Sequence, residues 1–254
     1  MTKDSHLTIA AIALVAYLSA DVAHHALGHG AACLALGGQI KLLSSVFVNC
    51  SLTGAVIDLA GPLANFLLGL FVLLAAHSMR CASSLIRLFF ALVVAFNLFW
   101  FWLQLAFSAT TMTDDWAWPM KQFHLTGLSR YGMIAVGIAG YLFTIRIVAR
   151  QMTSFSFPST RVRTIVGIAW VSAGIIAGVT AAFDHHAMAV MLRHALPQSL
   201  LSSIGLLFVP TRTGLSSTVD AATLLPLSLS WVVIAVLVGT ASILLLGPGV
   251  SFTS

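Results

Sequence analysis

Four side chains that can bind metals or transfer protons lie within nine residues near the start of the chain. They are Asp21, His24, His25 and His29, and the residues around them are apolar enough to cross a bilayer. Ionisable groups at membrane depth are energetically costly, so they normally face a partner, a cavity or an ion. The cluster therefore predicts a functional site inside the membrane, with a metal ion as the expected partner.

The spacing of the histidines favours His25 and His29 as metal ligands. Positions i and i+4 share one face of an α-helix, so two neutral imidazoles at this separation can bind one Zn(II) ion. Asp21 lies one turn earlier on the same stripe. On a regular helix His24 and His29 lie about 140° apart, and both could face one ion only through a local bulge. We therefore expect zinc at His25 and His29.

Composition identifies the chain as an integral membrane protein. Of its 254 residues, 59% are hydrophobic and 7% are charged, and the mean hydropathy is +1.01. Its apolar runs reach the roughly 20 residues that a transmembrane helix needs. The basic residues behind the net charge of +5 lie mostly between these runs, which suits membrane orientation better than nucleic-acid binding. We expect contact with the lipid bilayer and no nucleic-acid partner.

The expected fold class is an all-α polytopic membrane protein with about six transmembrane helices. The apolar runs that give these spans are 6–36, 53–77, 83–109, 130–149, 162–183 and 222–247. A weaker run at 187–209, broken by Pro197, could add a crossing. Between the first two spans, the stretch from Ile40 to Val48 follows Gly37 and Gly38 and forms either a short β-hairpin or an irregular loop.

The basic residues fall unequally on the two sides of these spans. One side carries Lys3, Arg80, Arg87, Arg146, Arg150, Arg161 and Arg163, and the other carries Lys41, Lys121, Arg130, Arg193 and Arg212. Cytoplasmic loops are enriched in Lys and Arg, so this bias places the N-terminus in the cytoplasm.

Two further groups of residues have structural interpretations. The cysteines Cys33, Cys50 and Cys81 show no C-x-x-C spacing, and we expect them to be small buried residues rather than metal ligands or a disulfide framework. The aromatic run at 99–102 is bulky, and we expect it to face lipid or the membrane interface.

Three segments of the first half resemble the site-2 protease family of intramembrane zinc metalloproteases. Residues 25–30, His-Ala-Leu-Gly-His-Gly, resemble the family's zinc-binding His-Glu-Leu-Gly-His helix. Residues 59–65, Leu-Ala-Gly-Pro-Leu-Ala-Asn, are similar to the Ala-Gly-Pro-x-Ala-Asn sequence of its next core helix. Asn97 and the later Asp114-Asp115-Trp116 are similar to the region that supplies an asparagine and the third, aspartate, ligand.

This resemblance covers roughly residues 21–118 and implies a division of the chain. Residues 1–120 would form a metalloprotease-like membrane core, and 121–254 would add transmembrane helices of unknown role. The zinc ligands would be His25, His29 and Asp115, with Asp114 and Asp21 as alternatives for the third ligand.

The implied substrate is a transmembrane or membrane-adjacent peptide, which pairing with an exposed edge of the 40–48 stretch would hold extended. The expected location is a bacterial cytoplasmic membrane. The sequence leaves the oligomeric state open.

Two departures from the family pattern bear on activity. Asp115 lies 18 residues after Asn97 without an intervening proline, whereas the family usually places this ligand two to three helical turns after the asparagine. Ala26 occupies the position of the glutamate that activates water, and the chain contains no glutamate at all. His24 or Asp21 would have to serve as base, and the loss of a positioned base typically lowers the rate by about 10²- to 10⁴-fold.

We therefore expect a slow or inactive zinc metalloprotease. One alternative is a natural pseudoprotease that binds membrane partners without cleaving them. Another is an intramembrane transporter whose histidines bind a metal ion or haem.

Overall fold

The computed structural model describes residues 4–79, 82–125, 127–211 and 224–252. Its helices that are long and apolar enough to cross a membrane are His6–Ala35, Ala55–Ser78, Ser84–Thr111, Leu128–Thr153, Ser159–Ala181 and Leu229–Leu246. They coincide with the six predicted runs, which confirms the all-α polytopic fold class. A helix satisfies its backbone hydrogen bonds internally, which is why uninterrupted apolar sequence takes this form in a bilayer.

The first span consists of three consecutive helical segments. These are α1 (His6–Val22), the π-helix η1 (Ala23–Gly30) and α2 (Ala31–Ala35). Ser5 caps the N-terminus of α1, because its hydroxyl accepts a hydrogen bond from the Thr8 amide at 3.2 Å. Gly37 ends the span with a left-handed φ of 81°, a conformation that glycine adopts without strain. The chain then turns back toward the bundle.

A short antiparallel hairpin follows the first span, as the sequence allowed. It consists of β1 (Ile40–Leu43) and β2 (Val48–Cys50). A disulfide joins Cys33 of α2 to Cys50 of β2. The prediction that these two cysteines are merely small buried residues is therefore wrong, because the hairpin folds back over α2 and brings residues 17 positions apart together. Cys81 lies outside the described residues.

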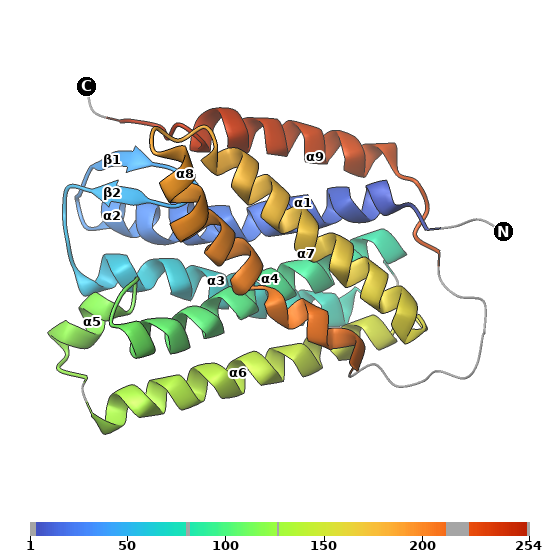
Figure 1. The fold of residues 1–254 in the computed structure, drawn as a ribbon, viewed down its shortest axis with the longest axis horizontal. Helices are drawn as coiled ribbons and strands as arrows, with labels where there is room; N and C mark the ends of the chain where they lie inside the picture. Colours follow the sequence, from blue (N-terminus) through green and yellow to red (C-terminus); the bar gives the residue numbers. More distant parts are fainter. Residues whose placement is uncertain (1–3, 80–81, 126, 212–223, 253–254) are drawn as a thin grey trace.

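The central span of the bundle is α4 (Ser84–Thr111), which packs between α3 (Ala55–Ser78) and α6 (Leu128–Thr153) (Figure 1). In its most apolar window 78% of the residues are buried, against 28% in each of these two neighbours. The aromatic run at 99–102 is accordingly buried or half-buried rather than lipid-facing, and Phe99 is 0% exposed. The prediction of a lipid-facing run is wrong because other helices surround α4.

After α7 (Ser159–Ala181), a broken helical run returns along the bundle (Figure 1). Its segments are α8 (Ala187–Val190), η2 (Met191–Ala195), η3 (Pro197–Leu201) and η4 (Ile204–Thr211). The segments η2 and η3 on either side of Leu196 are both π-helical, and η4 is a 3-10 helix. This run is the extra transit that the sequence left open, and it places the two chain ends at opposite ends of the bundle in Figure 1.

The last span consists of α9 (Leu229–Ala241) and η5 (Ser242–Leu246), and it packs against α1. The hairpin, η5 and the short helix α5 (Ala117–Gln122) lie toward one end of the bundle (Figure 1). At the opposite end, Arg161 pairs with Asp4 and Arg87 donates to the Ser154 carbonyl at 2.9 Å. Lys3, Arg80 and Arg212 lie outside the described residues.

Candidate metal centre

The histidines occupy a π-helix rather than a regular α-helix. A π-helix closes its hydrogen bonds between residues five apart, so positions i and i+5 come onto one face. Within η1, His24 and His29 therefore share a face, and their Nε2 atoms lie 3.2 Å apart. This is the local bulge that the pairing of these two residues requires. The structure thus brings His29 together with His24, and not with His25 as the α-helical spacing predicts.

Asp115 completes the group from a distant part of the sequence. Its Oδ2 lies 2.9 Å from His24 Nε2 and 3.2 Å from His29 Nε2. The chain reverses between α4 and α5, where Met112 and Asp114 take left-handed φ values of 56° and 69°. Aspartate tolerates this conformation better than most residues. The fold-back that an Asp115 ligand demands is therefore present.

Second hydrogen bonds determine the tautomers of both imidazoles. His29 Nδ1 lies 2.7 Å from the Ile57 carbonyl, which can only accept, so Nδ1 carries the proton. His24 Nδ1 lies 2.6 Å from Asn65 Oδ1. In the neutral imidazoles both Nε2 atoms then carry lone pairs that can bind a cation next to Asp115, as in metal sites where an outer partner fixes each histidine.

The orientation of the Asn65 amide follows from its other contacts. Its Nδ2 donates to the Ala20 carbonyl and to Asn97 Oδ1, each at 2.9 Å. Asn97 donates in turn to the Val93 carbonyl at 2.8 Å. Asn65 Oδ1 is thereby left to accept from His24. The two asparagines of the motif segments thus hold the His24 ring in place.

Two side chains of α4 support the group from the other side. Gln104 Nε2 donates to Asp115 Oδ2 at 2.7 Å and to Asp114 Oδ2 at 3.1 Å. Trp100 stacks on the His24 ring, with 4.7 Å between the centroids. Sequence reasoning missed both residues. Their spacing from Asn97, at i+3 and i+7, is that of one helix face and could have revealed them.

The two carboxyls of the turn differ in acidity. Burial raises the pKa of the Asp115 carboxyl, but the hydrogen bonds that His24 and His29 donate from Nε2 when they are protonated outweigh this effect and hold its pKa well below the usual range. Burial and the adjacent charge of Asp115 raise the pKa of Asp114 to about 6. Asp115 is therefore the carboxyl that stays ionised and able to bind a cation.

Small residues allow η1 to approach α3 closely. A Cβ on Gly61 would lie 2.3 Å from His29 Nε2, and a Cβ on Gly28 would lie 2.5 Å from the Gly61 Cα. Real side chains do not tolerate such contacts, so both positions need glycine. The Ala-Gly-Pro-x-Ala-Asn-like segment therefore serves the site twice, through the space at Gly61 and the amide of Asn65.

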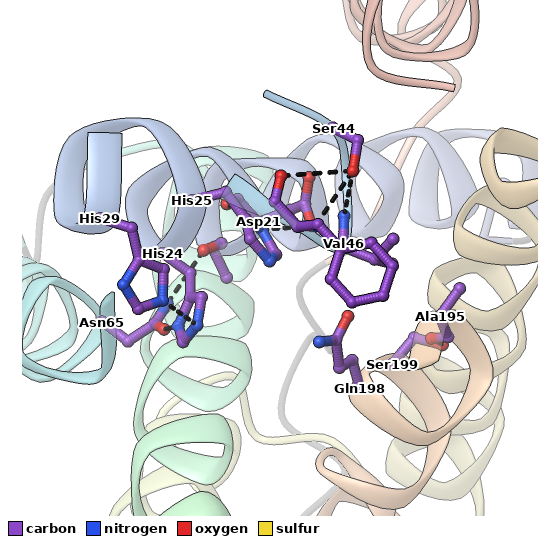
Figure 2. A network of polar contacts seen from close by, with 12 residues as sticks. Asp21, His24, His25, His29, Ser44, Val46, Asn65, Ala195, Gln198 and Ser199 are labelled. Atoms are coloured by element: carbon purple, nitrogen blue, oxygen red, sulfur yellow. Dashed lines mark hydrogen bonds and ion pairs between the residues drawn. The ribbon is translucent and has the colours of Figure 1, made fainter. Parts of the chain in front are cut away.

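His25 and Asp21 lie together, outside this group of three (Figure 2). His25 Nδ1 is 3.4 Å from Asp21 Oδ1 and 3.2 Å from the Asp21 main-chain oxygen. Ala26 is half-buried and follows His25. In the motif that this segment resembles, the glutamate directly follows the first histidine of the pair. With His24 as the first histidine, that position holds His25, and not Ala26.

The group fits a zinc ion. Zn–N and Zn–O bonds of about 2.0–2.2 Å at tetrahedral angles place ligand atoms about 3.3 Å apart. The three ligand atoms here are 2.9 to 3.2 Å apart, so a small expansion would admit the ion. Two imidazoles and one carboxylate are a donor set of catalytic zinc sites, which keep a further position open.

A cavity of about 300 Å³ lies beside the group. Trp100, Gln104 and Asp114 line it on the side of the histidines, and Arg193 and Gln198 line it from η2 and η3. Its other walls are largely apolar. The cavity therefore borders residues that contact the group, because Trp100 stacks on His24 and Gln104 donates to Asp115.

The chain was compared with protein-family models, curated proteins and solved structures, and nothing matches it.

Proposed function

We propose that this chain is a membrane-embedded zinc protein of the metalloprotease type, which acts slowly on transmembrane or membrane-adjacent peptides. The observation that carries the proposal is the convergence of two imidazole Nε2 atoms on one half-buried carboxylate, with each imidazole held by a second partner. Positive charge between the three groups, from a bound cation or from protons on the imidazoles, allows them to lie this close together. When bound there, zinc supplies Lewis acidity for attack on a peptide carbonyl.

The 300 Å³ cavity is the proposed approach for a peptide. Largely apolar walls with a few polar groups are typical of ligand sites. The edge of β1 is a poor place for strand addition, because Leu43 already exchanges two main-chain hydrogen bonds with Val250. The substrate would instead pair with β2, which contacts η1 beside the histidines.

Asp114 is the proposed proton acceptor. It is the one carboxylate that lines this cavity in the described part of the chain. The earlier candidates are poorly placed, because His24 belongs to the ligand group and Asp21 lies beside His25. An aspartate in a turn is positioned less rigidly than the glutamate of a helix, so turnover should be slow.

The test combines metal content with hydrolysis. The full chain, purified and placed in proteoliposomes, should contain about one zinc per chain and should slowly cleave a fluorescently labelled transmembrane peptide. Asp114→Asn should keep the zinc and lower cleavage by about 10²-fold. His24→Ala should lose both, and His25→Ala serves as the matched control that keeps zinc. A protein without zinc would overturn the proposal.

A second candidate function is that of a pseudoprotease, which binds zinc and membrane partners without cleaving them. The observation in its favour is the absence of glutamate from the whole sequence. Stoichiometric zinc combined with no cleavage, equally in the parent protein and in Asp114→Asn, would select this function. Haem binding is disfavoured, because ligand atoms within 3.2 Å of one another leave no room for a porphyrin between them.

The proposed location is a bacterial cytoplasmic membrane, with the N-terminus in the cytoplasm. The basic side chains Arg87, Arg150 and Arg161 lie on the side predicted to be cytoplasmic. The disulfide between Cys33 and Cys50 lies on the opposite side, and disulfides persist in oxidising compartments outside the cytoplasm. The basic residues and the disulfide thus indicate the same orientation in the membrane.

A further inference from the structure

A buried carboxyl one turn before the histidines takes no part in the metal centre. Asp21 is 1% exposed, and neither of its carboxylate oxygens accepts a hydrogen bond from the described residues. Its contact with His25 Nδ1, at 3.4 Å, is longer than a normal hydrogen bond. A carboxylate inside a bilayer is costly unless it is paired. Asp21 therefore needs a partner that the described protein groups do not supply.

Asp21 lines a small cavity of about 10 Å³ between five parts of the chain. Thr180 of α7 and Ser242 of η5 also line it, and both hydroxyls are buried without a hydrogen-bond partner among the described residues. Ser45, in the hairpin turn, and Tyr17 of α1 complete its polar wall. Orphaned oxygens from three segments far apart in the sequence thus face one volume.

We propose that this cavity binds one sodium ion. Its polar groups are all oxygens, and hard cations prefer oxygen ligands. A volume of about 10 Å³ holds one guest of the size of a water molecule, so the ion would enter without its hydration shell. One carboxylate balances one positive charge, whereas Ca²⁺ takes 6–8 oxygen ligands and Mg²⁺ usually keeps several waters.

The ion would link the first span to the last. Asp21 belongs to α1, Ser242 to η5 and Thr180 to α7. The last span is also the least buried, with 17% of its most apolar window covered. A shared ion would therefore add a further link between the most exposed span and the rest of the bundle. This role does not depend on zinc binding or on proteolysis.

Sodium binding is tested on the full chain in detergent. Radioactive sodium should bind saturably, at about one ion per chain, and the thermal unfolding midpoint should be higher in NaCl than in KCl or choline chloride of equal ionic strength. Thr180→Val and Ser242→Ala each remove one oxygen and should weaken sodium binding by about tenfold. Asp21→Asn should abolish it.

The control is Ser108→Ala. Ser108 also has a buried hydroxyl without a partner among the described residues, but it does not line this cavity, so the variant should bind sodium normally. His29→Ala should also bind sodium, which separates this proposal from the zinc site. Equal unfolding midpoints in the three salts, or sodium binding unchanged in both hydroxyl variants, would overturn the proposal and leave a buried water as the occupant.

Discussion

Two faces of the first span bury polar side chains in opposite ways. On the face toward α3, His24 and His29 have a protein partner for each ring nitrogen. On the face toward α7, the carboxylate of Asp21 has no hydrogen-bond partner among the described residues. Burial penalises both groups, and it penalises an ionised carboxylate more than a neutral imidazole. The difference indicates that the first face is built to hold a fixed geometry, and that the second relies on a small guest.

The neighbouring helices account for this difference. Helix α3 contributes Asn65, whose amide orients His24, and Gly61, which leaves space for His29. Helix α7 contributes Ala177 and Thr180 to the Asp21 cavity, and these short side chains reach no polar atom across it. The same span therefore carries a saturated network on one side and an unsaturated one on the other.

The strongest test of this comparison is the replacement of each of the three histidines by alanine, one at a time. His24→Ala and His29→Ala should each weaken zinc binding by more than the about 10- to 100-fold typical of a lost outer partner, because each removes a ligand. His25→Ala should bind zinc normally. The measurement is a zinc titration against a competing chelator. A loss in His25→Ala equal to that in His29→Ala would favour the α-helical pair instead.

Loss of the Asn65 amide should have the next largest effect. Asn65→Ala removes the group that fixes the His24 tautomer and leaves the Asn97 Oδ1 without its donor. Outer partners of this kind typically contribute about 10- to 100-fold in metal affinity, and we expect a loss in that range. The same chelator titration measures it. Unchanged affinity would mean that the Trp100 stacking alone orients the ring.

Gly61→Ala should weaken both zinc binding and folding, because the added Cβ would lie 2.3 Å from His29 Nε2. Overpacking typically costs about 1–3 kcal/mol, which corresponds to about tenfold or more in zinc affinity if it displaces His29. Gly167→Ala in α7 is the control, since no atom lies within 4 Å of its Cβ. Calorimetric unfolding should separate the two variants, and equal stability would contradict the close approach.

The smallest effect on zinc binding should come from a substitution on the face of the first span toward α7. Asp21→Asn alters a carboxyl that is not among the ligand atoms, and independent sites usually couple by less than about 0.5 kcal/mol, which is about twofold in affinity. Metal content by mass spectrometry should stay at one zinc per chain. If this variant lost its zinc, Asp21 would be a ligand and the two faces would not be independent.

Much of the fold was predictable because its signals are local. Each span is a continuous apolar run of the length that a bilayer requires, so the six spans follow from the hydropathy along the sequence. The position of the site was local too, because ionisable residues in such a run stand out. The disulfide between Cys33 and Cys50 was not predictable, because the course of a hairpin determines which cysteines meet. The burial of Phe99 likewise depends on helices that are remote in sequence.

The sequence by itself determined that the candidate site would lie at the histidines of the first span, and it left the third ligand open among Asp115, Asp114 and Asp21. Only the tertiary structure decided that His24, and not His25, joins His29. Residue spacing defines a face only when the helical pitch is known, and a π-helix changes that pitch. Close packing of Gly28 on Gly61, together with the hydrogen bonds of both histidines to α3, fixes the π-helical register. These contacts join residues that no local pattern connects.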